Sequence, residues 1–143
     1  MRKSAFTLIE LLITVAIMGI LFSISIFALT SARSSGRDGK RQADLQSIAS
    51  ALEIYRSDCG VYPSPSSGRV SNPLTGSEAA CAGNNYMQEV PQDPQGGVYL
   101  YARPTATSYE LCAHLEGGSG TETCGGSSNC GSGMTCNYKI VSP

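Results

Sequence analysis

The feature that most constrains this chain is an apolar run from Phe6 to Thr30, in which Glu10 is the one charged residue among 25. As a helix it would extend about 38 Å at about 1.5 Å per residue, enough to cross a bilayer core of about 30 Å. A helix on the surface of a globular domain has an apolar stripe, whereas this run is apolar on every face. The run therefore predicts a helix that spans a membrane.

The remainder of the chain is poor in aliphatic side chains. Of the 29 Leu, Ile, Val and Phe residues, 15 lie in the apolar run and 14 lie in the 113 residues from Ser31 to Pro143. All seven Tyr and all six Cys lie at or after Tyr55. An even number of Cys in a small, Gly-rich region predicts disulfides and an oxidising compartment.

A secretory signal peptide is the alternative interpretation of the N-terminus, because Arg2 and Lys3 precede the apolar run. The run is about twice as long as the apolar region of a usual signal peptide. No clean small-x-small cleavage site ends it, although Ala28 and Ala32 are candidates. These two features favour a retained helix.

Four basic residues follow the run, namely Arg33, Arg37, Lys40 and Arg41. We favour a solvated helix face for them. The alternative is a hinge at Gly36 and Gly39, because each Gly weakens a helix by about 1 kcal/mol relative to Ala. The four charges outnumber those of Arg2 and Lys3, so the positive-inside rule would place the C-terminal part inside. The cysteines place it outside, and we give them more weight.

Glu10 is unusual, because a carboxylate in an apolar helix costs free energy, less near the helix end than at its centre. Either Glu10 lies close enough to the interface to stay hydrated, or it meets a fixed positive charge. A free amine near Phe6 on a neighbouring copy would supply that charge.

The string AFTLIELL at residues 5–12, after a short basic leader, closely resembles the processing and methylation motif of type IV pilins and pseudopilins. The resemblance implies cleavage by a prepilin peptidase between Ala5 and Phe6 and N-methylation of Phe6. It also implies assembly of the apolar helices into a filament core, with Thr7 and Glu10 as assembly residues. Glu10 matches the family carboxylate that pairs with the terminal amine of an adjacent subunit.

Two later segments are also similar to this family, residues 43–63 (ADLQSIASALEIYRSDCGVYP) and residues 92–99 (QDPQGGVY). The first resembles the second half of the long pilin helix, and the second resembles the loop before the small sheet of major pseudopilins. Three departures stand out: Ala5 replaces the usual Gly, the apolar helix contains Gly19 but no Pro, and residues 117–133 contain Glu122 as their one acid. Because calcium prefers six or more oxygen ligands with carboxylates among them, we predict that this chain lacks the calcium loop of major pseudopilins and holds no metal.

The expected fold class is α+β and type IV pilin-like, with a long N-terminal helix on a small antiparallel sheet of about three strands, stapled by disulfides. The expected parts are a leader at 1–5, an apolar helix at 6–30, an amphipathic continuation at 31–62, a loop at 63–97, and a sheet with a Gly/Cys-rich loop at 98–143. One face of the second helix carries Leu45, Ile48, Ala49, Leu52 and Tyr55. The helix should end near Cys59 and Gly60, before Pro63.

The strand candidates are Val98–Ala102, Ser108–Leu115 and Thr135–Val141, each rich in Tyr or β-branched residues. Pro65, Pro73, Pro91 and Pro94 predict a loop rather than strands between Pro63 and Gly97.

Six Cys allow 15 connectivities, which the sequence alone does not resolve. The expected order of elements favours Cys59 with Cys81, Cys112 with Cys136, and Cys124 with Cys130. A zinc site is disfavoured because the spacings contain no C-x-x-C knuckle. His114, the one His, is better read as a surface or packing residue than as a catalytic base, and no catalytic signature or cofactor motif supports an enzyme.

The favoured function is that of a structural subunit of a type IV pilus-like filament, a homopolymer that requires a prepilin peptidase/methyltransferase and an inner-membrane assembly machinery. The subunit would sit in the cell membrane with its C-terminal domain outside, and then in an extracellular filament. The alternatives are a major pseudopilin of a type II secretion system, against which the missing acidic loop counts, and a membrane-anchored extracellular binding module that never polymerises. The net charge of -1 gives no support for nucleic-acid binding.

Overall fold

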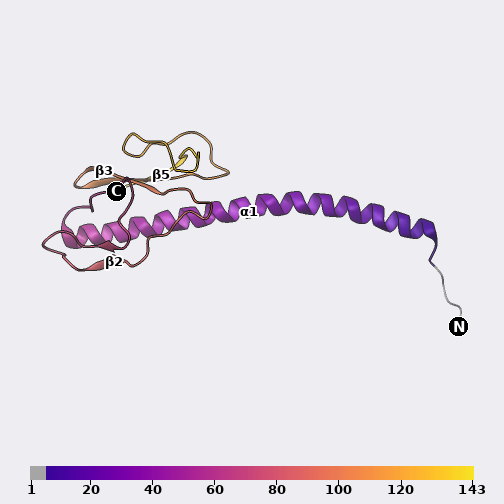
Figure 1. The fold of residues 1–143 in the computed structure, drawn as a ribbon, viewed down its shortest axis with the longest axis horizontal. Helices are drawn as coiled ribbons and strands as arrows, with labels where there is room; N and C mark the ends of the chain where they lie inside the picture. The colour runs from indigo at the N-terminus through magenta and orange to yellow at the C-terminus, as the bar shows by residue number, and fades with distance from the viewer. Residues whose placement is uncertain (1–5) are drawn as a thin grey trace. The chain divides into compact units, whose positions relative to one another are not determined.

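The computed structural model describes residues 6–143, so the expected leader and Ala5 lie outside the described residues. One long helix is followed by five short strands: α1 (Leu8–Cys59), β1 (Leu74–Thr75), β2 (Asn85–Met87), β3 (Leu100–Thr105), β4 (Ser108–Ala113) and β5 (Tyr138–Val141) (Figure 1). The chain divides into two compact units, one ending at Gly36 and the other, the folded unit, comprising Arg37–Pro143. The α+β, pilin-like fold class is confirmed.

Local chemistry accounts for both ends of α1. At its start, the Thr7 carbonyl oxygen accepts a hydrogen bond from the Leu11 backbone N–H at 3.3 Å. At its end, Gly60 takes a left-handed φ of +80° while its N–H donates to the Arg56 carbonyl oxygen at 2.8 Å. That conformation favours Gly because it has no Cβ, so the predicted end of the helix is confirmed.

The larger sheet has the order β3-β4-β5 and is antiparallel throughout. Leu111 of β4 lies opposite Tyr101 of β3 and Ile140 of β5. The three predicted strands are therefore present, although β3 begins and ends later than expected and the other two are shorter.

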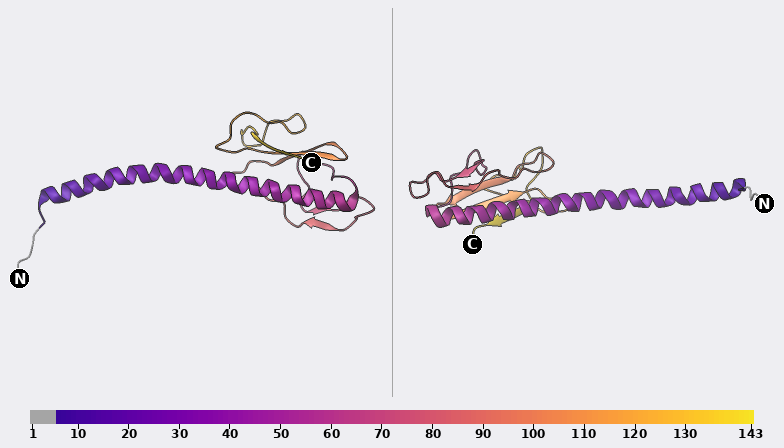
Figure 2. Two further views of the ribbon diagram at one scale, coloured as in Figure 1. Left: turned by 180° about the vertical axis from the view of Figure 1, so that it is seen from behind. Right: turned by 90° about the horizontal axis from the view of Figure 1, so that it is seen from below.

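A second sheet, in which β1 pairs with β2, corrects the prediction of a loop over residues 63–97. Pro73 directly precedes β1 and Pro91 follows β2, so the prolines flank these strands and do not interrupt their pairing. Figure 2 shows the two sheets on different sides of the C-terminal half of α1.

The predicted face of α1 forms the core of the folded unit. Leu45, Ile48, Leu52 and Tyr55 are at most 1% exposed, and Ala49 packs at the edge of the same cluster. The strands and loops contribute the remaining core side chains, chiefly Tyr62, Leu74, Tyr99, Tyr101, Tyr109 and Leu111. Tyrosine rings thus occupy much of the volume that aliphatic side chains fill in other cores.

The buried tyrosines retain hydrogen bonds for their hydroxyl groups. Tyr101 donates to the Pro63 carbonyl oxygen at 2.7 Å, and Tyr99 donates to Asp44 Oδ2 at 2.8 Å. Burial raises the pKa of both phenols, and for Tyr99 the hydrogen-bonded Asp44 carboxylate raises it further. Both side chains therefore stay neutral hydrogen-bond donors.

The six cysteines form three disulfides, and two of these correct the expected pairing. Cys59 joins Cys81 as expected, but Cys112 joins Cys124, and Cys130 joins Cys136. The sheet register explains the difference, because Cys112 lies opposite Lys139 and leaves Cys136 beyond the start of β5. The last two bonds form a separate buried layer with Leu100 and Ala102 beside it.

Candidate functional site

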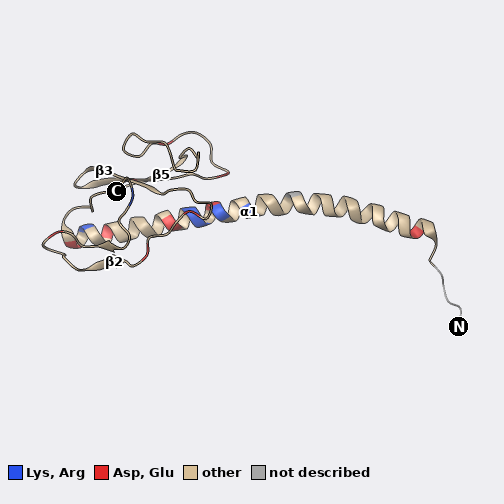
Figure 3. Ribbon diagram, viewed as in Figure 1, with Lys and Arg blue, Asp and Glu red and all other residues tan. Residues whose placement is uncertain are grey.

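The apolar half of α1 is the first candidate for function. Within the described residues, α1 is the one helix long and apolar enough to cross a membrane, with a mean hydropathy of 2.6 over its most apolar window and no part of that window buried. From Leu8 to Leu29 the large apolar side chains whose exposure is described are between 51% and 81% exposed. Figure 3 shows no charged residue in this half of the helix after Glu10 near its start. Such a surface requires lipid or other apolar helices around it.

Hydroxyl groups within this apolar segment bond to the helix itself. Thr14 donates to the Leu11 carbonyl oxygen at 2.9 Å, and Ser23 donates to that of Ile20 at 2.8 Å. Ser25 makes the same kind of bond to Leu21 at 2.8 Å. These bonds lower the cost of placing hydroxyl groups in an apolar environment, because the alternative is an unsatisfied donor.

Thr7 and Glu10, for which the family resemblance implies a role in assembly, contact one another at the start of α1. Glu10 Oε2 accepts hydrogen bonds from the Thr7 backbone N–H at 3.0 Å and from its hydroxyl at 2.9 Å. The Glu10 backbone N–H donates back to the Thr7 hydroxyl oxygen at 3.3 Å. This reciprocal arrangement is a capping box, which satisfies backbone donors that have no partner within the helix. Phe6 lies beside it and is 85% exposed.

The second candidate region is a buried ionic cluster around Arg41 in the folded unit. Arg41 is fully buried, and its guanidinium contacts Asp93 at 2.6 Å, Asp38 at 2.7 Å and Glu116 at 3.0 Å. Arg37 also binds Glu116, with both of its N–O distances at 2.6 Å. The favoured interpretation of a solvated basic face is therefore wrong for Arg41, whereas Arg37 stays partly exposed and pairs with Glu116.

Hydrogen bonding keeps the acids of this cluster ionised. The Arg37 guanidinium, helped by Arg41, lowers the pKa of Glu116 from 4.5 to about 2. Burial by itself would raise the pKa of Asp38, but the backbone N–H groups of Gly117 and Glu116 together with Arg41 lower it overall. The pKa of Asp93 is lowered in the same way, chiefly by Arg41 against the effect of burial. At neutral pH the cluster is therefore a set of ionised groups that ties two loops to α1.

Sequence reasoning missed this cluster because two of its three acids, Asp93 and Glu116, lie far from Arg41 in the sequence. Asp93 belongs to the QDP segment, whose prolines predict a loop, and no local pattern in this segment indicates a helix cation as the partner of Asp93. One signal was available in the sequence. Arg37 and Arg41 are two cations one helical turn apart, so they lie on the same face of the predicted helix and can share acidic partners.

His114 has a structural contact. Its Nδ1 lies 2.7 Å from the Thr135 carbonyl oxygen, which can only accept, so the ring donates and joins the end of β4 to the loop before β5. This position agrees with the interpretation of His114 as a packing residue.

Two family patterns match the sequence. The prokaryotic N-terminal methylation motif matches residues 1–29, and the family described as type II secretion system (T2SS), protein G matches residues 28–129. Together they span the apolar helix and most of the folded unit.

Individual relatives carry the same description. The chain is 34% identical to the type II secretion system core protein G of Pseudomonas aeruginosa, over 90% of this chain and 91% of the relative. It is 32% identical to the protein of that name from Vibrio cholerae, over 84% of this chain and 88% of the relative. No solved structure matches the chain at a significant level. With a methylation motif, a pilin-like fold and these relatives, the chain belongs to the type II secretion system protein G family, a group of pseudopilins within the type IV pilins.

Proposed function

We propose that this protein is the major pseudopilin of a type II secretion system, a structural subunit that polymerises into a short filament. The proposal is supported by the match to the protein G family over residues 28–129 and by relatives named type II secretion system core protein G. The sequence alone favoured a pilus subunit, and the comparisons favour its first alternative instead. The missing acidic loop at residues 117–133 is a poor discriminator, because the family match extends across most of that loop.

One observation carries the proposal at the level of structure. A membrane-length apolar helix whose apolar side chains are exposed is joined in one chain to a folded unit held by three disulfides. Such a helix has two environments that bury it, the bilayer before assembly and the helices of other copies afterwards. A role of this kind is structural and requires no catalytic group.

Processing at the N-terminus belongs to the same proposal. A prepilin peptidase cleaves between Ala5 and Phe6 and methylates the Phe6 amine. Glu10 then pairs with the Phe6 amine of an adjacent copy, while Thr7 positions the Glu10 carboxylate through the capping box. Glu10 Oε1, which has no hydrogen bond among the described residues, supplies the acceptor for that amine. Before assembly, the subunit resides in the inner membrane with its folded unit on the outer side of that membrane. The secretion machinery then drives assembly into the filament.

The intact, non-reduced mass of protein sheared from its native cells tests the proposal, together with secretion by cells that lack the gene. The expected protein begins at Phe6. Relative to the reduced, unmethylated chain, its mass is higher by one CH2, because a methyl group replaces an amine hydrogen, and lower by the six hydrogens that three disulfides remove. If the protein is a pseudopilin, cells that lack the gene should no longer secrete enzymes but should still carry surface pili. Loss of pili with secretion intact would restore the pilus interpretation, and a mass that retains residues 1–5 would favour the anchored binding module.

A further inference from the structure

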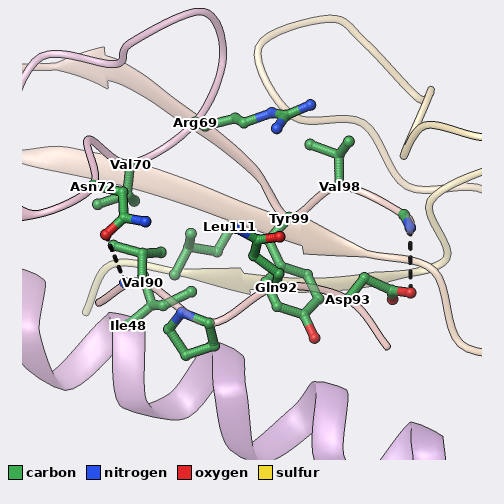
Figure 4. Close-up of a pocket in the computed structure, with 12 residues that line it drawn as sticks. Ile48, Arg69, Val70, Asn72, Val90, Gln92, Asp93, Val98, Tyr99 and Leu111 are labelled. Carbon is green, nitrogen blue, oxygen red and sulfur yellow. Dashed lines mark hydrogen bonds between the residues drawn. The ribbon is translucent and has the colours of Figure 1, made fainter. Parts of the chain in front are cut away.

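A small pocket in the folded unit lies between α1 and the segment that connects β2 to β3 (Figure 4). Its volume is about 120 Å³. This is room for an aliphatic side chain but less than the roughly 300 Å³ or more of a typical cofactor site. Its apolar walls come from Ile48, Val70, Val90, Pro91, Val98, Tyr99 and Leu111.

The unpaired polar side chains that line this pocket supply hydrogen-bond donors, and the Gln92 amide also supplies an acceptor oxygen. Among residues 6–143, no hydrogen bond or ion pair engages the exposed guanidinium of Arg69 or the side-chain amide of Gln92. Asn72 Oδ1 accepts from the Val90 backbone N–H at 3.0 Å, which leaves Asn72 Nδ2 free to donate. The one acid on the wall, Asp93, is already paired with Arg41.

The backbone of Arg69 is held in place by a tight turn. Ser66 and Arg69 exchange two backbone hydrogen bonds, at 2.8 and 3.0 Å. A site with an apolar interior and an unpaired guanidinium at its edge suits a branched aliphatic group that lies beside a carboxylate, because guanidinium binds carboxylate in a forked geometry.

The surface of the folded unit presents such a pair of groups once. Across residues 37–143, two large apolar side chains are more than half exposed, Ile54 at 57% and Val141 at 58%. The acid opposite Val141 is Glu110, whose carboxylate already binds Lys139 and the Gly125 N–H. Ile54 lies one helical turn before Asp58, which is exposed and accepts one hydrogen bond, from Tyr86 at 3.2 Å.

The Ile54 side chain cannot enter the pocket of its own chain. Ile48 lines the pocket and is 1% exposed, whereas Ile54 is 57% exposed. Six residues at about 100° each place the two side chains about 120° apart around the helix. Only another molecule can bring an Ile54–Asp58 pair to this pocket.

We propose that Ile54 and Asp58 of one subunit dock into this pocket on a second copy, where Asp58 pairs with Arg69. The two surfaces differ, so the contact is heterologous, and heterologous contacts extend into open filaments unless their rotation closes a ring. The proposal deepens the proposed function, since it rests on polymerisation and names a contact between the folded units.

Charge reversal tests the contact in native cells. Arg69→Glu and Asp58→Arg should each reduce the filament recovered by shearing by about tenfold or more, because each variant places like charges together. The double variant should recover most of the filament, because the ion pair is restored in reverse. Two measurements report whether each variant folds: its abundance in the membrane, and a non-reduced mass that shows three intact disulfides.

Glu78→Arg is the matched control, since Glu78 is exposed and its carboxylate has no hydrogen bond or ion pair among residues 6–143. This variant should assemble normally and should not rescue Arg69→Glu. If wild-type protein forms filaments and the double variant folds without recovering them, the contact is wrong while the proposed function stands. If wild-type protein forms no filament, the proposed function itself fails.

A crosslinking experiment tests the same contact even if a charge variant does not fold or reach the membrane. A photo-reactive benzoylphenylalanine in place of Ile54 should link, in filaments of mixed heavy- and light-isotope subunits, to residues 69–72 or 90–98 of a different copy. Links to other regions alone, or links within one copy, would overturn the proposal.

Discussion

Arg41 and Asp93 lie 52 positions apart in the sequence, yet Arg41 Nε donates to Asp93 Oδ2 at 2.6 Å and Nη2 donates to Oδ1 at 3.4 Å. The Arg41 side chain is fully buried and that of Asp93 is 3% exposed. Asp93 also accepts the backbone N–H of Gln95 at 2.7 Å, so it shapes its own loop while it binds the helix. This pair fixes the segment before β3 on α1.

Replacing Arg41 should therefore destabilise the folded unit strongly. Arg41→Met leaves Asp93 buried without its cation, and breaking a buried pair from one side costs about 3–5 kcal/mol. The free energy of unfolding, from urea titration of the full chain in detergent micelles, measures this loss. Removing both partners, as in Arg41→Met with Asp93→Leu, should cost less than the sum of the single changes.

Lys40→Met is the matched control for Arg41. Lys40 is the adjacent helix cation, it is exposed, and it has no ion pair among the described residues, so the change should lie within about 0.5 kcal/mol of wild type. Equal losses for the two variants would mean that the ionic cluster contributes nothing specific to stability.

Acid should weaken the folded unit through Glu116. Its pKa falls from 4.5 to about 2, chiefly through Arg37, so its contribution to stability is fully present above pH 4.5 and is lost as the pH falls toward about 2. Asp38 and Asp93, whose pKa values are also lowered, act in the same direction. Glu116→Gln should flatten the dependence of stability on pH in this window, which unfolding measured at a series of pH values would detect.

Glu78→Gln serves as the comparison for the acid experiment, because its carboxylate is exposed and makes no ion pair in the described part of the chain. It should leave the acid profile of wild type unchanged. A Glu116→Gln profile as steep as that of wild type would contradict the role assigned to Glu116.

The disulfide pairing can be checked directly. Peptic digestion at acidic pH, which prevents exchange, should release linked peptides that join Cys112 to Cys124 and Cys130 to Cys136. Replacing Cys59 and Cys81 together by Ser should cost about 3 kcal/mol, and replacing Cys130 and Cys136 about 2 kcal/mol, because the first bond closes the longer loop. A peptide that links Cys112 to Cys136 would contradict the structure.

The sequence predicted the helix face and the strands of the larger sheet correctly, because local residue periodicity determines both. Leu45, Ile48 and Leu52 recur at helical spacing, and each is at most 1% exposed in the core. The Tyr-rich segments became β3, β4 and β5 for a similar reason, since alternation along a strand is a local property.

Features that depend on distant pairing were beyond the sequence. The choice between Cys124 and Cys136 as the partner of Cys112 depends on the register of β5, which places Lys139 and not Cys136 opposite Cys112. The two distant partners of Arg41, Asp93 and Glu116, likewise come from the segment before β3 and from the loop after β4. The number of prolines in residues 63–97 predicts a loop, yet β1 and β2 form there. A Pro disrupts pairing only when it lies within a strand, so its position matters more than the number of prolines.

Calcium should have no effect on the folded unit. Residues 117–133 contain Glu122 as their one acid, whereas a calcium site needs several carboxylate or carbonyl oxygens together. The unfolding temperature should be the same with EDTA and with added Ca²⁺, since a ligand that does not bind the native state does not stabilise it. A reducing agent should lower it, and a rise with Ca²⁺ would reveal a site that the sequence does not predict.

Glu10→Gln separates two roles of this side chain at the start of α1. A Gln oxygen can still accept the two hydrogen bonds that Thr7 donates, so the helix start should be retained, but the side chain no longer carries a charge for an amine. We expect normal abundance in the membrane and no filament in the sheared fraction. Thr7→Val should weaken the cap by about 1 kcal/mol and reduce assembly without abolishing it, because the carboxylate remains. If Glu10→Gln assembled as well as wild type, Glu10 would act as a helix cap alone, and the proposed pairing with the Phe6 amine of a neighbour would be wrong.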